Sequence, residues 1–234
     1  AYRQGWRAIR EALGPDIFLL GVGTMGTLAG FVDGMRLTLD NAPCWDEDKP
    51  NDLLGNSRGF KPTVRTGARR WYYQNRLWVN HDDLIFFRSY PDKKHPPLSF
   101  EEARTFATWI GLGGGIVKLG DKLLDLAPHP EQIDVVRRLL PAWPEGARPT
   151  DVLTRDYPET YRLHVKAPAG EWDVVGLFNW GTNRDLTANP PTAMPDAART
   201  YRVPCADDCL AYEFWSEAFL GRHTGPFSVT VEPH

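Results

Sequence analysis

The chain has 234 residues, of which 42% are hydrophobic and 24% charged, and its formal net charge is −3. This composition is typical of a globular protein with room for one large or two modest domains. It contains no apolar run of the roughly 18 residues that a membrane-spanning helix needs. It also has neither a basic block nor a strong net charge, so its charge pattern does not indicate a nucleic-acid partner. The cysteines, Cys44, Cys205 and Cys209, lack metal-like CxxC spacing; Cys205 and Cys209 could form a disulfide, but the odd count argues against a wider disulfide framework.

Helix-like segments recur through the first part of the chain. The first is expected at the N-terminal end, where three apolar residues share one helical face before a Gly–Pro stop: Trp6, Ile9 and Leu13, then Gly14 and Pro15. A second begins near Ser99, because Glu102 follows three residues later and completes a capping-box signature before an apolar run. Further helices are predicted over residues 62–77 and 130–143, and residues 46–60 are predicted to be a polar loop.

Apolar segments between these helices are predicted to be buried strands, at residues 16–23, 34–40, 77–87 and 114–121. Alternating strands and helices favour parallel βα units. Each of these strands ends in a glycine-rich or polar cluster, and the carboxyl ends of the strands in a βα barrel surround one shared site. We therefore expect those clusters to face the same site.

The pattern changes near residue 148. Short alternating runs separated by Gly, Pro and Asn clusters follow, as is typical of an antiparallel sandwich. The Pro-rich link at residues 139–151 marks the boundary. We predict two domains, 1–147 and 148–234, the second acting as a packing module rather than a carbohydrate-binding one.

In order, these segments resemble the C-terminal half of clan D glycoside hydrolases, most closely family 36, the α-galactosidase (melibiase) group. The resemblance covers nearly the whole chain and rests on the stretches GPDIFLLGVG, GFVDGMRLTLDNAPCW, LWVNHDDLIFFR, LSFEEARTFATWIGLGGGIVKLGD, GLFNW and YEFWSEAFLG. It implies an α/β fold, the C-terminal half of a (β/α)8 TIM barrel followed by an antiparallel β-sandwich domain. This chain would supply barrel strands five to eight and most of the sandwich.

The resemblance also implies a catalytic residue. In that family an Arg-x-x-x-Asp element on strand six carries the general acid/base, and here the element runs from Arg36 to Asp40. Asp40 would protonate the leaving oxygen and then activate water, while Arg36 holds its carboxylate and the sugar. Asp83, which ends the strand-seven element, and Leu84 beside it would line the sugar site. Taken alone, Arg36 and Asp40 also fit a simple ion pair or a turn-forming Asp.

Other positions depart from the family pattern. Val22, beside Gly23, stands where the family has a cysteine that touches the sugar, so galactose is only the family default. His81 and Asp82 replace an Asp-Pro pair. The run His81 to Asp83 could alternatively suggest metal ligands, but no second His or Cys cluster accompanies it.

Three further features have weaker interpretations. Trp45 would help to shape the pocket. Asp121 either orients neighbours in the pocket or caps a loop. Residues 21–26 are rich in glycine but lack the remaining residues of a phosphate-binding motif.

The predicted function is hydrolysis of terminal α-linked sugars with retention, acting on an oligosaccharide or glycoside. No cofactor is implied, since two carboxylates suffice for this chemistry. The family nucleophile lies upstream of the segments matched here, so we expect this chain to need the N-terminal half of the barrel and to be inactive alone; a homo-oligomer is left open. Alternatives are a non-catalytic carbohydrate-binding or structural remnant, and a raffinose-synthase-like transglycosylase.

Overall fold

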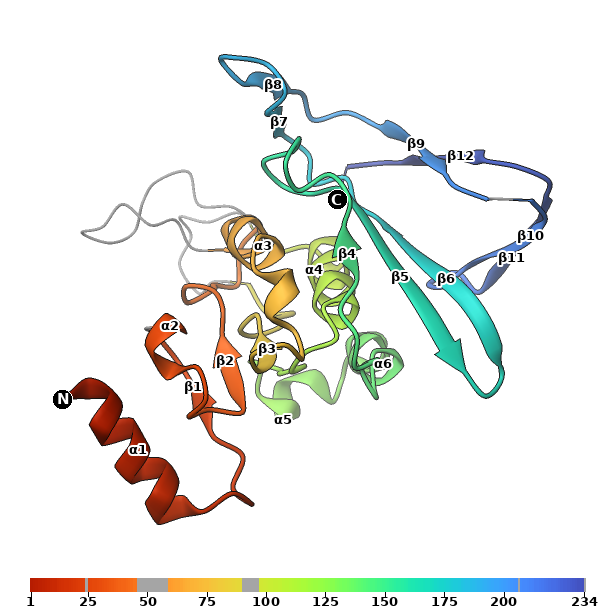
Figure 1. The fold of residues 1–234 in the computed structure, drawn as a ribbon. Helices are drawn as coiled ribbons and strands as arrows, with labels where there is room; N and C mark the ends of the chain where they lie inside the picture. Colours follow the sequence, from red (N-terminus) through yellow and green to blue (C-terminus); the bar gives the residue numbers. More distant parts are fainter. Residues whose placement is uncertain (24, 46–58, 90–96, 206, 234) are drawn as a thin grey trace.

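The computed structural model describes residues 1–23, 25–45, 59–89, 97–205 and 207–233 (Figure 1). Most of the predicted 46–60 loop therefore lies outside the described residues. Within the described ranges, no helix is both long and apolar enough to cross a membrane. The chain runs from a region of helices and short parallel strands into a region of antiparallel strands.

The first helix forms where the sequence predicts it. Helix α1 covers Tyr2–Leu13, and Gly14 ends it with a positive φ of 76°, a conformation that glycine adopts at little cost. None of the residues of α1 is fully buried, and Trp6 packs only at the edge of a small cluster under the first strands. The predicted helix and its stop are confirmed.

A parallel sheet holds the predicted strand ends together. Strands β1 (Leu20–Gly21), β2 (Gly34–Arg36) and β3 (Val79–His81) lie side by side in that order, and the short helix α2 (Met25–Leu28) connects the first two. Segment 114–121 continues the sheet through parallel bridges from Ile116 to His81 and from Leu119 to Ile85. The parallel arrangement is confirmed, but the paired stretches are shorter than predicted, because a strand is regular only where a neighbour supplies hydrogen bonds.

The connecting helices are also shorter than predicted. The single helix expected at 62–77 is divided into α3 (Phe60–Ala68) and a 3₁₀ turn, η1 (Trp71–Tyr73). Helix α4 (Phe100–Leu112) has the predicted capping box: Glu102 N donates to Ser99 Oγ at 3.1 Å, and Ser99 N donates to Glu102 Oε2 at 2.7 Å. Helices α5 (Leu123–Leu126) and α6 (Pro130–Arg138) follow. Helix α6 ends at Arg138, shortly before Pro141, and a proline disfavours helical backbone at the residue that precedes it.

Every strand pair after residue 148 is antiparallel among the described residues. The strands are β4 (Arg148–Pro149), β5 (Thr160–Ala167), β6 (Gly170–Leu177), β7 (Asn183–Asp185), β8 (Thr192–Met194), β9 (Arg199–Val203), β10 (Cys209–Glu213), β11 (Ala218–His223) and β12 (Phe227–Val231). They form β4–β5–β6 and three two-stranded sheets, which is only part of the predicted sandwich. A disulfide joins Cys205 to Cys209.

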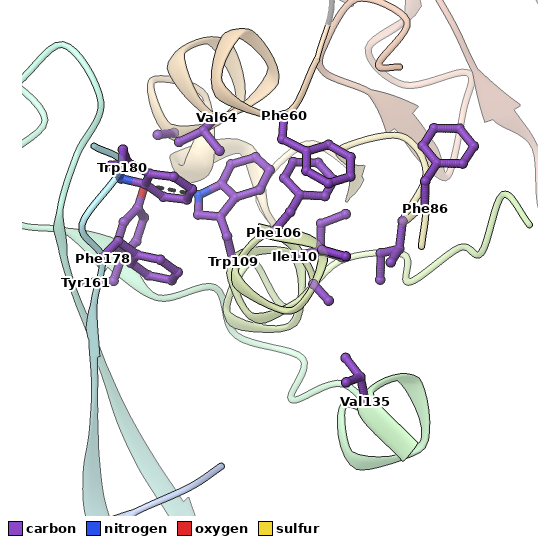
Figure 2. Packing of buried hydrophobic residues seen from close by; sticks show 14 of the residues in the cluster. Phe60, Val64, Phe86, Phe106, Trp109, Ile110, Val135, Tyr161, Phe178 and Trp180 are labelled. Atoms are coloured by element: carbon purple, nitrogen blue, oxygen red, sulfur yellow. Dashed lines mark hydrogen bonds between the residues drawn. The ribbon is translucent and has the colours of Figure 1, made fainter. Parts of the chain in front are cut away.

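The main hydrophobic core joins the parallel and antiparallel regions (Figure 2). Phe60 of α3 stacks on Phe106 of α4 with ring centroids 4.0 Å apart. On the other side, Trp109 Nε1 donates to the hydroxyl of Tyr161 in β5 at 3.0 Å, and Phe178 contacts Tyr161 edge to face. This core crosses the predicted boundary at 147/148, so the division into two domains stays a prediction.

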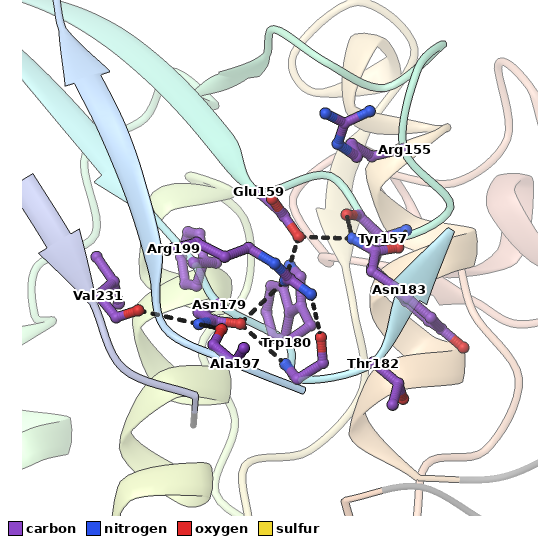
Figure 3. A network of polar contacts seen from close by, with 12 residues as sticks. Arg155, Tyr157, Glu159, Asn179, Trp180, Thr182, Asn183, Ala197, Arg199 and Val231 are labelled. Atoms are coloured by element: carbon purple, nitrogen blue, oxygen red, sulfur yellow. Dashed lines mark hydrogen bonds and ion pairs between the residues drawn. The ribbon is translucent and has the colours of Figure 1, made fainter. Parts of the chain in front are cut away.

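A buried polar network fixes the antiparallel region where it meets this core (Figure 3). Glu159 is 3% exposed and accepts hydrogen bonds from Arg199, from Asn183 at 2.8 Å and from the Tyr201 hydroxyl at 3.1 Å. Arg199 also donates to Asn179 Oδ1 at 2.9 Å. Because nearly all the polar atoms are paired, the network holds a buried charge without leaving it uncompensated.

Candidate functional site

Arg36 brings together the two carboxylates that the sequence singles out. Arg36 Nη2 lies 2.6 Å from Asp40 Oδ1, and Arg36 Nη1 lies 3.8 Å from Asp83 Oδ1. The Arg36 side chain is only 21% exposed and that of Asp83 only 9%, whereas Asp40 is 60% exposed. One carboxylate is therefore held inside the fold, and the other is fixed in direction but accessible.

The register of the parallel sheet explains this grouping. Arg36 pairs with His81 across β2 and β3, and both strands end at these residues. Asp40 and Asp83 follow in the segments that leave the two strands, at the same edge of the sheet. Their neighbourhood is thus a consequence of parallel pairing, as the alternation of strands and helices predicts.

The backbone at Asp83 is held in an unusual conformation. Its φ is 72°, in the left-handed region that side chains other than glycine rarely adopt. Asn41 N donates to Asp83 Oδ2 at 2.8 Å, and the Asn41 side chain donates to the carbonyl of Leu84. These bonds tie the segment after β2 to the segment after β3. Leu84 is partly buried and packs against the core, and its predicted contact with the sugar stays a prediction.

Arg70, which sequence reasoning missed, supports the same segment from the helical side. Its Nη1 donates to the carbonyl of Leu37, while Leu37 N donates to the carbonyl of His81 at 2.9 Å. The residue that follows β2 is therefore fixed through both of its backbone groups. Arg70 lies 33 positions further along the chain, and no local motif indicates that it reaches Leu37.

His81 is 3% exposed and lies between charges of both signs. Burial lowers its pKa; Lys118 and Arg36 also lower it, and Asp83 opposes them. The neutral imidazole is therefore favoured at neutral pH. In the parts of the chain that the structure describes, no three His, Cys, Asp or Glu side chains group in a way that could hold a metal ion.

Val22 and Gly23 follow β1 at the same end of the sheet. Gly21 pairs with Met35, which brings Val22 to the level of Arg36 on the neighbouring strand. Val22 is 51% exposed, and Gly23 has a φ of 102°. Both positions are compatible with a surface that a ligand could touch, and their roles stay predictions.

Trp45 and Asp121 both contact neighbouring parts of the fold. Trp45 stacks on the buried Trp180, with ring centroids 5.7 Å apart, and belongs to the rim of the core. Asp121 accepts a hydrogen bond from Phe87 N at 2.7 Å and lies 3.1 Å from Arg88 Nη1. Asp121 therefore fixes the loop after Ile85, which agrees with the second of its two predicted interpretations.

No family model matches this sequence. Among solved structures, the fold is similar to that of α-galactosidase I from Mortierella vinacea, with a TM-score of 0.63 and 10% sequence identity, covering 100% of this chain and 60% of that one. It is also similar to a GH27 β-L-arabinopyranosidase from Geobacillus stearothermophilus, with a TM-score of 0.56 and 14% identity, covering 100% of this chain and 52% of that one. A variant of the latter, in complex with arabinose, gives a TM-score of 0.55 at 14% identity, covering 100% of this chain and 53% of that one.

At these identities the comparisons show the fold. The chain has the fold of part of a glycosidase of the α-galactosidase kind and spans roughly half to three-fifths of the length of these neighbours. The sequence resemblance points to family 36, whereas both arabinopyranosidase structures belong to family 27.

Proposed function

We propose that this chain is the C-terminal half of the catalytic (β/α)8 barrel, with most of the following β-sandwich, of a retaining family-36-like glycoside hydrolase. The observation that carries this proposal is the contact of Arg36 with both Asp40 and Asp83 at the carboxyl edge of a parallel sheet. That edge is where barrel enzymes place their reacting groups. The shared fold with α-galactosidase and arabinopyranosidase structures supports it.

In this proposal Asp40 is the general acid/base. Its exposed carboxyl group can reach the oxygen of a bound glycoside, donate a proton to the departing alcohol, and later take a proton from the attacking water. Arg36 holds that carboxyl group in one direction through the 2.6 Å contact. Asp83 is too deeply buried to turn freely, and we assign it to binding a sugar hydroxyl.

Retention of configuration requires a second carboxylate as the nucleophile, about 5–5.5 Å from the acid/base. We place this nucleophile in residues outside 1–234. The family resemblance locates it on barrel strand four, and neighbours with this fold are considerably longer than this chain. No cofactor takes part in the proposed reaction, because a pair of carboxylates supplies both the proton and the nucleophile.

The proposed substrate is an oligosaccharide or glycoside with a terminal α-linked sugar, and galactose is the first candidate. One neighbour is an α-galactosidase, and another has arabinose bound, a sugar whose pyranose ring lacks the hydroxymethyl group of galactose. Val22 offers the sugar an apolar contact at the position where the family usually has a cysteine. Transfer to another sugar in place of water would use the same residues.

The leaving group tests the role of Asp40. In the complete protein that carries this chain, Asp40→Asn should lower kcat/KM on a natural α-galactoside about 10²–10⁴-fold, the usual contribution of proton transfer. An aryl galactoside with an acidic phenol should lose much less in kcat/KM, because its departing oxygen needs little protonation. Asp134→Asn, on the exposed side of α6, is the matched control and should leave both substrates unaffected.

Equal losses on both substrates would contradict general acid catalysis by Asp40. Near-native activity of Asp40→Asn on the natural substrate would show that another group supplies the proton. A complete protein without activity on any glycoside would instead favour a non-catalytic remnant.

A further inference from the structure

Asp82 is a buried carboxyl group that the proposed reaction does not use. It lies between His81 and Asp83 in the segment that leaves β3, and it is 9% exposed. Asp83 faces Arg36 and Asn41 on the sheet edge, whereas Asp82 faces the helices that cover the sheet.

Two helices lie against the Asp82 carboxyl group, and α3 is the closer of the two. A methyl group at Gly67 of α3 would lie 2.5 Å from Asp82 Oδ1, and one at Gly113, just after α4, would lie 3.5 Å from Asp82 Oδ2. The indole ring of Trp109 closes the same space, 2.6 Å from the Gly67 methyl position. Among the described residues, Asp82 Oδ1 has no hydrogen-bond partner.

Both helices present their C-terminal turns to this carboxyl group. Helix α3 ends at Ala68, one residue after Gly67, and α4 ends at Leu112, one residue before Gly113. The C-terminal end of a helix carries partial negative charge, which disfavours a carboxylate beside it.

Two charged side chains act on Asp82 in opposite directions. Arg70, beyond the end of α3, favours the ionised form, and Asp83 on the same segment disfavours it. The hydroxyl of Tyr161 in β5 accepts a hydrogen bond from Trp109, and Asp82 contributes to the raised pKa of that hydroxyl. Burial is the largest influence and raises the pKa of Asp82 to about 7.

We propose that Asp82 is a positioning residue that acts as a neutral carboxylic acid, packed between the C-terminal turns of α3 and α4, and that its ionisation loosens this packing. In the neutral form it anchors the segment after β3, so that the adjacent Asp83 keeps its left-handed backbone and its place beside Arg36. In the ionised form, a charge without sufficient partners is driven toward water, and the anchor of Asp83 weakens. The molecule thus contains a pH-sensitive support beneath the candidate site, and this property holds whether or not the site hydrolyses glycosides.

The first test follows the carboxyl group directly. The complete protein is labelled with ¹³C at the aspartate carboxyl carbons and titrated by NMR. We expect one aspartate resonance to titrate near pH 7 and to be absent from the spectrum of Asp82→Asn. If every aspartate carboxyl group titrates below about pH 5, the proposal is wrong. The wild-type titration needs no variant to fold.

The second test measures urea unfolding against pH. The folded pKa of Asp82 is raised above its ordinary value of 3.8, so its contribution to stability is present at low pH and lost as pH rises toward about 7. The wild-type urea midpoint should therefore fall between about pH 4 and pH 7 relative to that of Asp82→Asn, whose amide resembles the neutral acid, and should stay level above that range. Asp173→Asn is the matched control, because hydrogen bonds from Arg162 and His164 lower the pKa of Asp173. That variant should lose stability at neutral pH. An Asp82→Asn variant with a lower midpoint than wild type at about pH 8 would show that the fold uses the charge, and would overturn the proposal.

Discussion

Replacing Gly67 by alanine tests the packing around Asp82, because here two effects of known size oppose each other. Gly67 lies inside α3, and alanine in a helix interior is normally about 1 kcal/mol more favourable than glycine. The added methyl group, however, would lie 2.5 Å from Asp82 Oδ1 and 2.6 Å from the Trp109 ring. Both neighbours are buried side chains, and overpacking of this kind costs about 1–3 kcal/mol. We therefore expect Gly67→Ala to lower the free energy of unfolding by up to about 2 kcal/mol.

Gly5→Ala is the matched control. Gly5 lies inside α1, and a methyl group there would meet nothing within 4 Å. That substitution should raise the free energy of unfolding by up to about 1 kcal/mol, since only the helix propensity changes. The assay is urea unfolding of the complete protein, followed by circular dichroism. If Gly67→Ala stabilises the protein as much as Gly5→Ala does, the close packing of α3 on Asp82 and Trp109 is refuted.

Three further substitutions have defined outcomes. Ser99→Ala removes the capping box of α4 and should cost about 1 kcal/mol of unfolding free energy in urea titrations; no loss would contradict the cap. Asp33→Asn should destabilise at neutral pH and progressively less as pH falls below 3.8, because a backbone hydrogen bond from Leu19 and the side chain of Arg10 lower the pKa of Asp33, so its contribution is lost as pH falls through that lowered pKa; thermal melts over this range that show an unchanged destabilisation would contradict the prediction. Glu159→Gln leaves the buried Arg199 without its charged partner and should cost about 3–5 kcal/mol; a calorimetric loss under 1 kcal/mol, roughly that of an exposed ion pair, would contradict the burial of that network.

Local signals in the sequence were sufficient for much of the fold. The capping box at Ser99 and the Gly14 stop depend on neighbouring residues only, and both are present. The parallel pairing of the first strands follows from the alternation of strands and helices, and it places Asp83 within reach of Arg36, which also contacts Asp40 four residues further along its own segment. The contact is observed, while the catalytic role of Asp40 is a proposal that kinetics must decide.

Tertiary contacts account for what the sequence did not predict. The helix expected at 62–77 is interrupted after Ala68, and the preceding Gly67, which has no side chain, makes room for Asp82 and Trp109 from distant segments. Arg70 reaches the carbonyl of Leu37 from 33 positions away, and no periodic pattern records such a contact. In the sequence, Asp82 cannot be distinguished from other polar residues at strand ends, because the two helices that lie against it come from other segments of the chain. Residues of this kind can be recognised only from the assembled structure.

The configuration of the azide product is the measurement that tests the central claim most directly. With azide present, the complete Asp40→Asn enzyme is given an α-galactoside whose leaving group needs no acid. If Asp40 is the acid/base, the glycosyl-enzyme still forms, and azide attacks it without requiring a general base. Azide should then restore turnover and give α-galactosyl azide, the product of two inversions. Formation of β-galactosyl azide would mean a single inversion at a site whose nucleophile had been removed, and would contradict the assignment of Asp40 as the acid/base.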